Sequence, residues 1–224
     1  MPETHFQFPV EPPIHKAGFP AWRPLPEVAE RVAGCVLLAV AGPAVAVSAL
    51  AISLLSRRSP FVAHLRAGKD NKPFWMLKLR TMWDRTDAAL RGEGWVERIV
   101  AEPDEDLKQP CDPRVTSRFA AFCRRHSIDE FPQFWHVARG EMSLVGPRPL
   151  TRTEVMRYYG LHAAELLSVK PGITGLWQVR GRSAIRFPER AALDLELVRT
   201  LNLRTYLKIL VRTLPALIHG KGAW

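Results

Sequence analysis

Residues 112–149 read DPRVTSRFAAFCRRHSIDEFPQFWHVARGEMSLVGPRP, and the rest of the 224-residue chain is predicted to be arranged around this stretch. It holds two adjacent carboxylates, Asp129 and Glu130, among several arginines, and it ends in a Gly-Pro-Arg-Pro turn. The prolines on both sides of Arg148 have fixed φ angles, which limits the backbone around a guanidinium that can clamp phosphate oxygens. Together these features indicate chemistry on a phosphate.

The two carboxylates have a structural and a chemical interpretation. Ser127-Ile-Asp-Glu130 has the form of a capping box, in which a serine and a glutamate satisfy free amides at a helix start. The surrounding cations favour chemistry, because carboxylates repel a phosphate unless arginines or a divalent metal lie between them. Mg²⁺ binds one protein carboxylate together with substrate oxygens, which leaves the second carboxylate free to act as a nucleophile.

Composition restricts the partners of the chain. With 47% hydrophobic residues it can bury a real core, and its formal net charge of +10 favours nucleic acid, an acidic lipid headgroup or a phosphorylated substrate. Its aromatic residues do not form the stacking platform of a single-strand binder, so no nucleic acid is expected. Cys35, Cys111 and Cys123 lack Cys-x-x-Cys spacing, which argues against a disulfide framework or a zinc site and favours a reducing compartment.

Residues 32–55 form an apolar run of 24 residues without a charged side chain. At ~1.5 Å per residue such a helix can cross ~30 Å of hydrocarbon, so a membrane helix is predicted. Gly42 and Pro43 lie at its midpoint, where proline removes a backbone donor and should kink or break the helix. A kinked span and a re-entrant hairpin both follow, and basic residues on both sides leave the two open. A buried helix of a soluble core is the third alternative.

Four further segments are interpreted from composition and periodicity. Residues 1–26 are proline-rich and predict an extended tail. Residues 84–110 indicate a helix and loop insertion, whose acidic run is interpreted as solvated. Residues 170–182 are rich in Gly and Pro and indicate either a loop around a ligand or a turn followed by a short strand. Residues 187–218 have a helical leucine periodicity, which predicts one or two amphipathic helices near a membrane surface.

A strand and a helix are predicted on either side of the insertion. Within residues 59–83, apolar and basic residues alternate from Trp75 to Arg80, which predicts a short strand with one basic edge. Residues 114–125 predict an amphipathic helix with basic flanks and one apolar face, formed by Val115, Phe119, Phe122 and Cys123.

Five groups of residues, in the order and spacing of one family, carry a resemblance. They are Lys72-Pro-Phe with Lys78-Leu-Arg-Thr-Met82, Asp112-Pro-Arg-Val-Thr116, Ser127-Ile-Asp-Glu-Phe-Pro-Gln133, Gly140-Glu-Met-Ser-Leu-Val-Gly-Pro-Arg-Pro149, and Pro171-Gly-Ile-Thr-Gly-Leu-Trp-Gln-Val179 with Gly181-Arg182. The chain resembles the bacterial sugar transferases, the monotopic phosphoglycosyl transferases that start glycan assembly on polyprenyl phosphate. Its Gly-Lys-Gly-Ala-Trp ending looks like that of exopolysaccharide-initiating members.

The resemblance implies an architecture. The fold class would be α/β and mostly helical, with an extended tail at 1–26, a re-entrant membrane helix at 27–58 broken at Gly42 and Pro43, and a catalytic domain at 59–224. Interfacial amphipathic helices would hold this domain at the bacterial inner membrane, on the cytosolic face. Membrane lipid is therefore an expected partner.

The resemblance also implies a two-step reaction. Asp129 would attack the sugar-bearing phosphate of a UDP-sugar donor, release UMP and hold a phosphosugar, which polyprenyl (undecaprenyl) phosphate would then accept. Glu130 would bind the cofactor Mg²⁺. Phosphate would be held by a set of cations, namely Arg124 and Arg148, with Lys78, Arg80 and Arg114 added. Glycosyltransferases that act on the product would be further partners.

Several positions depart from the family pattern. The usual Lys-Arg-x-x-Asp start appears as Glu30-Arg-Val-Ala-Gly34, a Gln-x-x-Arg segment appears as His64-Leu-Arg66, and a common Asn before Gly-Arg is Arg180. None of these changes touches the paired carboxylates, so they bear on substrate identity more than on activity. The alternative function is a non-catalytic membrane adaptor whose basic surface recruits acidic lipid or nucleic acid.

Overall fold

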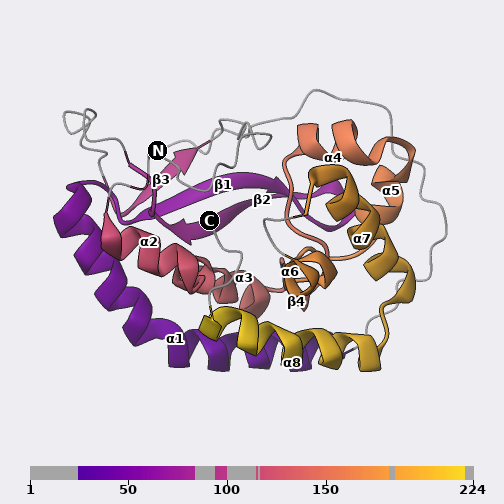
Figure 1. The fold of residues 1–224 in the computed structure, drawn as a ribbon, viewed down its shortest axis with the longest axis horizontal. Coiled ribbons are helices and arrows are strands. Elements are labelled where there is room, and N and C mark those ends of the chain that lie inside the picture. Colours follow the sequence, from indigo (N-terminus) through magenta and orange to yellow (C-terminus); the bar gives the residue numbers. More distant parts are fainter. Residues whose placement is uncertain (1–24, 84–93, 100–114, 116, 182–184, 220–224) are drawn as a thin grey trace.

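The computed structural model describes residues 25–83, 94–99, 115, 117–181 and 185–219. Helices dominate this part of the chain around two small sheets, which confirms the α/β, mostly helical fold class (Figure 1). Outside the described residues lie nearly all of the predicted tail, most of the insertion, Cys111, Arg114 and Arg182.

The elements follow one another along the chain as helices interrupted by short strands. In order they are α1 (Glu27–Ser56), β1 (Phe61–Ala67), η1 (Lys69–Asn71), β2 (Pro73–Leu79), β3 (Val96–Ile99), α2 (Arg118–Arg125), η3 (Ile128–Gln133), α3 (Phe134–Arg139), β4 (Ser143–Val145), α4 (Arg152–Tyr159), η4 (Gly160–His162), α5 (Ala163–Leu166), β5 (Gly172–Thr174), α6 (Leu176–Arg180), α7 (Phe187–Thr200) and α8 (Leu203–His219).

The larger sheet has three strands in the order β2-β1-β3. β1 and β2 form an antiparallel hairpin, and β3 pairs with β1 in parallel. The sequence predicted only the second of these strands, and β3 lies where a helix and loop were expected. In β2, Phe74 and Met76 are buried. Alternate residues of a strand point to the same side, so Lys78 shares this inward face and the basic edge faces the interior.

The second sheet joins two distant turns. β4 and β5 pair in parallel, with Ser143 opposite Gly172 and Val145 opposite Thr174. A Cβ atom at Gly172 would collide with the backbone of Gly146, so the two turns can approach this closely only because both residues are glycine. The interpretation of residues 170–182 as a turn followed by a short strand is confirmed, with α6 after the strand.

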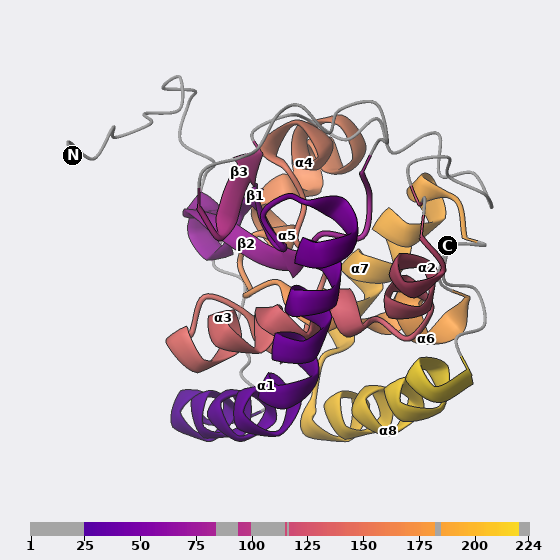
Figure 2. The same ribbon diagram turned by 90° about the vertical axis from the view of Figure 1, so that its left-hand side faces the viewer.

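Helix α1 is one continuous helix that contains Pro43 in its interior. Figures 1 and 2 show that its axis changes direction part-way along. Proline lacks the N–H that would bond to the carbonyl of Ala39, and its ring crowds that carbonyl, so Pro43 accounts for a bend. The break predicted at Gly42 and Pro43 is therefore corrected to a bend inside an unbroken helix.

Both halves of α1 pack on the rest of the molecule. In the first half, Gly34 lies directly against the backbone of Ala138 in α3, and Arg31 donates to the Ala138 carbonyl at 3.0 Å. In the second half, the fully buried Ile52 packs in a cluster with Leu79 of β2. The two ends of the apolar helix are thus both fixed to the domain that follows it.

Helix α2 is shorter than predicted, and three residues of the predicted apolar face, Val115, Phe119 and Cys123, are buried or packed against a core cluster. It begins at Arg118, where the Ser117 side chain accepts hydrogen bonds from the amides of Phe119 and Ala120. Ala120 and Cys123 are fully buried, whereas Phe122, which was predicted to share the apolar face with Cys123, is 50% exposed.

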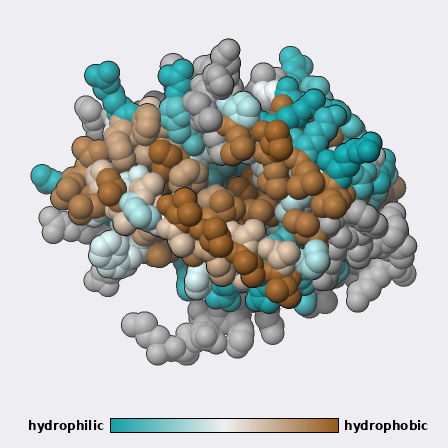
Figure 3. Space-filling model, turned by 90° about the horizontal axis from the view of Figure 1, so that it is seen from below, coloured by the Kyte–Doolittle hydropathy of each residue, from teal (hydrophilic) through white to brown (hydrophobic). Residues whose placement is uncertain are grey.

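One face of the molecule carries a large apolar surface, seen from below in Figure 3. The first part of α1 and the whole of α8 lie along this side, and the second part of α1 rises away from it (Figures 1 and 2). In the described part of the chain, α1 is the one helix long and apolar enough to cross a membrane. The exposed large apolar side chains of these two helices are Val28, Val32, Val36, Val40, Val47, Leu50, Leu54, Leu55, Leu203, Leu207, Val211 and Leu214.

Replacing Gly34 by valine is expected to lower the free energy of unfolding by about 1–3 kcal/mol, the usual cost of overpacking. The reason is that a Cβ atom there would lie 2.6 Å from the amide nitrogen of Ala138, and a backbone atom cannot rotate away. Denaturant unfolding in detergent measures the loss. Cys35→Val, at the neighbouring exposed position, is the matched control and should leave stability within about 0.5 kcal/mol of the wild type.

Candidate active site

The paired carboxylates lie on the short helix η3, which begins after Ser127. Ser127 adopts a left-handed backbone with φ 55°, and its side chain makes no cap hydrogen bond. The structural interpretation of this motif, a capping box, is therefore not confirmed; the described chain has a capping box at Thr151 and Glu154. The carboxylate of Glu130 instead pairs with cations of other segments.

Glu130 is held between two cations from different elements. Its Oε1 atom lies 2.8 Å from the Nζ of Lys78 on β2 and 3.7 Å from the Nη1 of Arg148. The carboxylate and the ammonium side chains are 23% and 16% exposed, so the first pair is only partly screened by water. The geometry thus brings together three of the predicted site residues.

Asp129 is almost entirely buried, and this burial raises the pKa of its carboxyl to about 6. Lys78 opposes the shift and Arg124 opposes it less strongly, while the charge of Glu130 adds to it. The structure therefore places the predicted cations Lys78 and Arg124 around Asp129. Above pH 6 the carboxylate is mostly ionised yet poorly solvated, a state that suits a nucleophile.

Arg148 lies in the turn between β4 and α4, flanked by two prolines without amide hydrogens. Its backbone N–H is the only amide donor in Pro147–Arg148–Pro149, and Asp194 of α7 accepts it. Asp194 also accepts a hydrogen bond from the Tyr159 hydroxyl at 3.0 Å. A buried carboxylate thus fixes the turn that presents Arg148 to Glu130.

Trp177 adds an aromatic surface beside this turn. The guanidinium carbon of Arg148 lies 5.7 Å from the ring centroid, and that of Arg190 lies 4.8 Å away. Cation–π contacts of this kind orient a guanidinium without neutralising it. Sequence reasoning missed Asp194, Tyr159 and Arg190. One sequence feature could have pointed to Asp194: it is an acidic residue between Leu193 and Leu195 in a helix with leucine periodicity.

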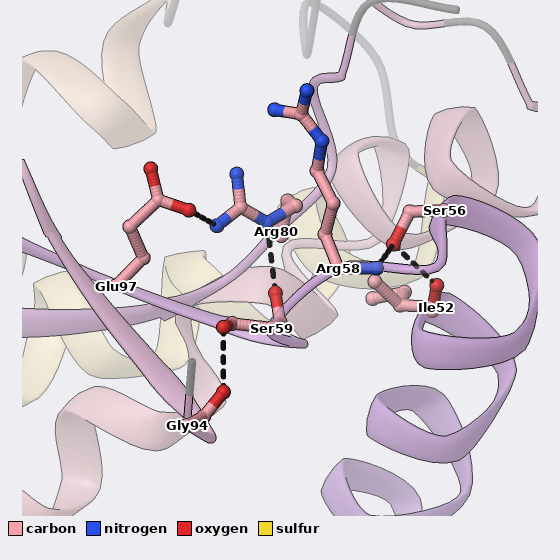
Figure 4. A network of polar contacts seen from close by, with 7 residues as sticks. All are labelled: Ile52, Ser56, Arg58, Ser59, Arg80, Gly94 and Glu97. Atoms are coloured by element: carbon pink, nitrogen blue, oxygen red, sulfur yellow. Dashed lines mark hydrogen bonds and ion pairs between the residues drawn. The ribbon is translucent and has the colours of Figure 1, made fainter. Parts of the chain in front are cut away.

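The structure does not bring Arg80 to the carboxylates. Its Nε donates to the carbonyl of Ser59 at 2.8 Å, and its guanidinium pairs with Glu97 of β3 (Figure 4). Ser59 in turn donates to the carbonyl of Gly94 at 2.6 Å. Arg80, 5% exposed, therefore fastens the end of β2 to β3. These contacts give no support to the predicted phosphate-binding role of Arg80, and Arg114 lies outside the described residues.

The residues fit a hard divalent cation that is held partly by a substrate. In the described part of the chain no three His, Cys, Asp or Glu side chains come together as a metal cage. Mg²⁺ does not require one, since one carboxylate with phosphate oxygens and water completes its shell. Glu130, 23% exposed beside Arg148, is a donor of this kind.

Comparison with known proteins identifies this class of site. The model of the family described as bacterial sugar transferase matches residues 23–220, and the chain belongs to that family. It is 34% identical over 214 residues to the exopolysaccharide production protein ExoY of Rhizobium meliloti, covering 91% of this chain and 92% of ExoY.

Two further relatives carry more specific names. The UDP-glucose:undecaprenyl-phosphate glucose-1-phosphate transferase of Caulobacter vibrioides is 37% identical over 217 residues, covering 90% of this chain and 75% of that protein. The UDP-galactose-lipid carrier transferase of Erwinia amylovora is 40% identical over 167 residues, 74% of this chain. The match spans 35% of the Erwinia protein.

Asp194→Asn is expected to stabilise the protein increasingly as the pH rises from about 4 to about 7. Burial raises the pKa of Asp194 from 3.8 to about 7, so the folded state binds a proton that the unfolded state releases, and the wild type loses stability across this window. The difference between variant and wild type should grow by up to roughly 4 kcal/mol and level off above pH 7. Urea unfolding at a series of pH values measures it. If the difference in unfolding free energy between Asp194→Asn and the wild type does not change with pH, Asp194 is not a buried group with a raised pKa.

Proposed function

We propose that this chain transfers a sugar 1-phosphate from a UDP-sugar to polyprenyl phosphate. The observation that carries the proposal is the buried Asp129, flanked by Lys78 and Arg124 and adjacent to Glu130. The names of the relatives from Caulobacter and Erwinia support the substrate classes, a UDP-sugar and a lipid carrier. The ExoY relative supports a place at the start of exopolysaccharide assembly.

The proposed reaction has two displacements at one phosphorus. In the first, a carboxylate oxygen of Asp129 bonds to the sugar-bearing phosphorus, and the bond to the bridging oxygen breaks, so that UMP leaves with the electron pair. In the second, an oxygen of polyprenyl phosphate bonds to the same phosphorus, and the acyl phosphate bond breaks. Asp129 is regenerated, and the product is a polyprenyl diphosphate sugar.

Cations at the site would offset the charge of the diphosphate. Arg148 presents a planar fork suited to phosphate oxygens, and Lys78 lies next to both carboxylates. Glu130 would help to hold Mg²⁺, which when bound supplies further positive charge to the leaving phosphate. Charge arranged in advance in this way stabilises a phosphoryl transition state without reorganisation.

A re-entrant position of α1 in the membrane is part of the proposal. Its two halves contact the same domain through Arg31 and Ile52, whereas the ends of a straight span lie ~30 Å apart on opposite sides of the hydrocarbon. On α8, Leu203, Leu207 and Val211 form an exposed apolar stripe, next to a stripe of Arg204, Lys208 and Arg212. Such a pair of stripes suits a helix in the interface of an acidic membrane.

Asp129→Asn is expected to abolish UMP release from a UDP-sugar in the presence of Mg²⁺ and polyprenyl phosphate, because an amide is not a nucleophile of comparable strength. Screening UDP-sugars for UMP release identifies the donor. Mass spectrometry of wild-type enzyme mixed with that donor should then show a phosphosugar adduct on the tryptic peptide that contains Asp129. Asp70→Asn, at an exposed turn residue, is the control and should retain full turnover. Undiminished turnover by Asp129→Asn would overturn the nucleophile assignment.

Both flanks of α1 are expected on the cytosolic side. Single cysteines placed at Lys16 and at the exposed Lys72, in a chain without its native cysteines, should resist a membrane-impermeant maleimide in intact spheroplasts. Both should react after permeabilisation. Labelling of Lys16→Cys alone from outside would show a spanning helix and refute the re-entrant position.

A further inference from the structure

His136 is a buried histidine of α3 that the proposed reaction does not use. Its Nδ1 atom lies 2.6 Å from the Oε2 of Glu141, and its Nε2 atom lies 3.0 Å from the backbone nitrogen of Leu77. An amide nitrogen can only donate, so Nε2 must be the acceptor and carries no proton. Nδ1 then carries the proton of the neutral ring and donates it to Glu141.

The acceptor of His136 is aimed at the open edge of the sheet. In the part of the chain that the structure describes, the sheet has the order β2-β1-β3, so β2 is an edge strand there and one row of its amides has no strand partner among these residues. Leu77 supplies one of these amides, and the next residue, Lys78, binds Glu130. Two adjacent residues of β2 are therefore tied to the continuous segment formed by η3 and α3, one by backbone and one by side chain.

The surroundings of His136 keep the imidazole neutral. Burial lowers the pKa of His136 below its ordinary value of 6.5, Glu141 opposes this, and Arg139 reinforces it. From β2, the ring of Phe74 packs edge-on at 5.4 Å. From α1, Arg31 approaches α3 but binds the carbonyls of Ala138 and Arg139. The one cation of β2 nearby in sequence, Lys78, is held by Glu130.

We propose that His136, oriented by Glu141, is a positioning residue that sets the place of Lys78 at the paired carboxylates by accepting the Leu77 amide. The role rests on the proposed function, in which Lys78 offsets charge at Asp129 and Glu130. A protonated His136 would present a second donor to the Leu77 N–H. The hydrogen bond from this amide to Nε2, called the tie below, would then be lost. The tie is therefore present above pH 6.5 and disappears as the pH falls through the lowered pKa of the folded state.

Two variants separate positioning from simple packing. His136→Gln places an amide oxygen the same number of bonds from Cβ as Nε2, so it can accept the Leu77 N–H but cannot be protonated. His136→Leu fills the site without an acceptor. His162→Gln, at a histidine whose side chain is 57% exposed, is the matched control.

Hydrogen exchange tests the tie without any assay of activity. Overlapping peptides that isolate the Leu77 amide should show a protection factor about tenfold lower in His136→Leu than in the wild type. His136→Gln and His162→Gln should keep the wild-type value at pH 7.5. As the pH falls through the lowered pKa of His136, after correction for intrinsic exchange, protection should fall in the wild type and stay constant in His136→Gln.

Turnover tests the consequence for Lys78. His136→Leu should lower kcat and kcat/KM equally, by about 10- to 100-fold, as expected for loss of an interaction made in the transition state. His136→Gln should recover activity to within about threefold. The pH profile of kcat/KM should also fall less steeply on its acid side in His136→Gln than in the wild type, since the variant lacks one group that titrates there.

The possible failures are distinguishable. Wild-type protection at Leu77 in His136→Leu would refute the tie itself, whether or not the enzyme is active. A confirmed tie with unchanged turnover in His136→Leu would refute positioning while leaving the reaction intact. Failure of the wild type to release UMP from any UDP-sugar would refute the proposed function, and the exchange experiment would still decide the tie. If His136→Leu does not fold, the pH dependence of protection in His136→Gln against the wild type decides it alone.

Discussion

The open edge of β2 is the constraint on which the site depends. An edge strand presents unpaired amides and carbonyls, and proteins cover such edges with a helix or a loop. Here the cover is η3 and α3, and the Lys78–Glu130 pair at 2.8 Å joins the two layers. Removing one partner of a partly buried pair leaves an uncompensated charge, so the same contact that closes the sheet also fixes the acidic pair.

The apolar helix takes part in the site as well as in the proposed membrane contact. The Cys123 thiol of α2 makes a hydrogen bond with the Ser48 side chain of α1. The charge of Asp129 raises the pKa of the same thiol. The second half of α1 therefore lies close to the segment that carries Asp129. Burial is the largest cause of the raised pKa of Asp129, and α1 contacts η3, the helix that carries Asp129. The environment of Asp129 is thus linked to the docking of α1.

The sequence predicted well the features that depend on local chemistry. The apolar run, the proline inside it, the helices at 187–218 and the adjacency of Asp129, Glu130 and Arg148 all follow from spacing or from family motifs. The family motifs also pointed to Lys78, whose strand is far from η3 in sequence. Its partner could be known only once β2 was placed beside η3.

The errors share one physical origin, which is tertiary contact acting on short segments. Ser127-Ile-Asp-Glu130 fits a capping box, but the cations of β2 and of the Arg148 turn hold the glutamate instead. Arg80 matches a family motif, yet its guanidinium is held by Ser59 and Glu97. Asp194 and His136 gave no motif signal, because each acts on the backbone of a distant residue, and no pattern of side chains records a backbone partner.

The length of the site elements shows why these distant contacts decide the chemistry. η3 and α3 have six residues each, and β4 has three, whereas an isolated helix needs about 12–15 residues to be even marginally stable in water. Their conformations are therefore maintained by what covers them, namely β2 at one side and α1 at the other. A carboxylate on such an element keeps its position only while both covers are in place. It follows that detachment of α1 would loosen Asp129 and admit water to it, lowering its pKa and weakening its proposed role as a poorly solvated nucleophile, so docking of α1 on the domain and a competent site are expected to occur together.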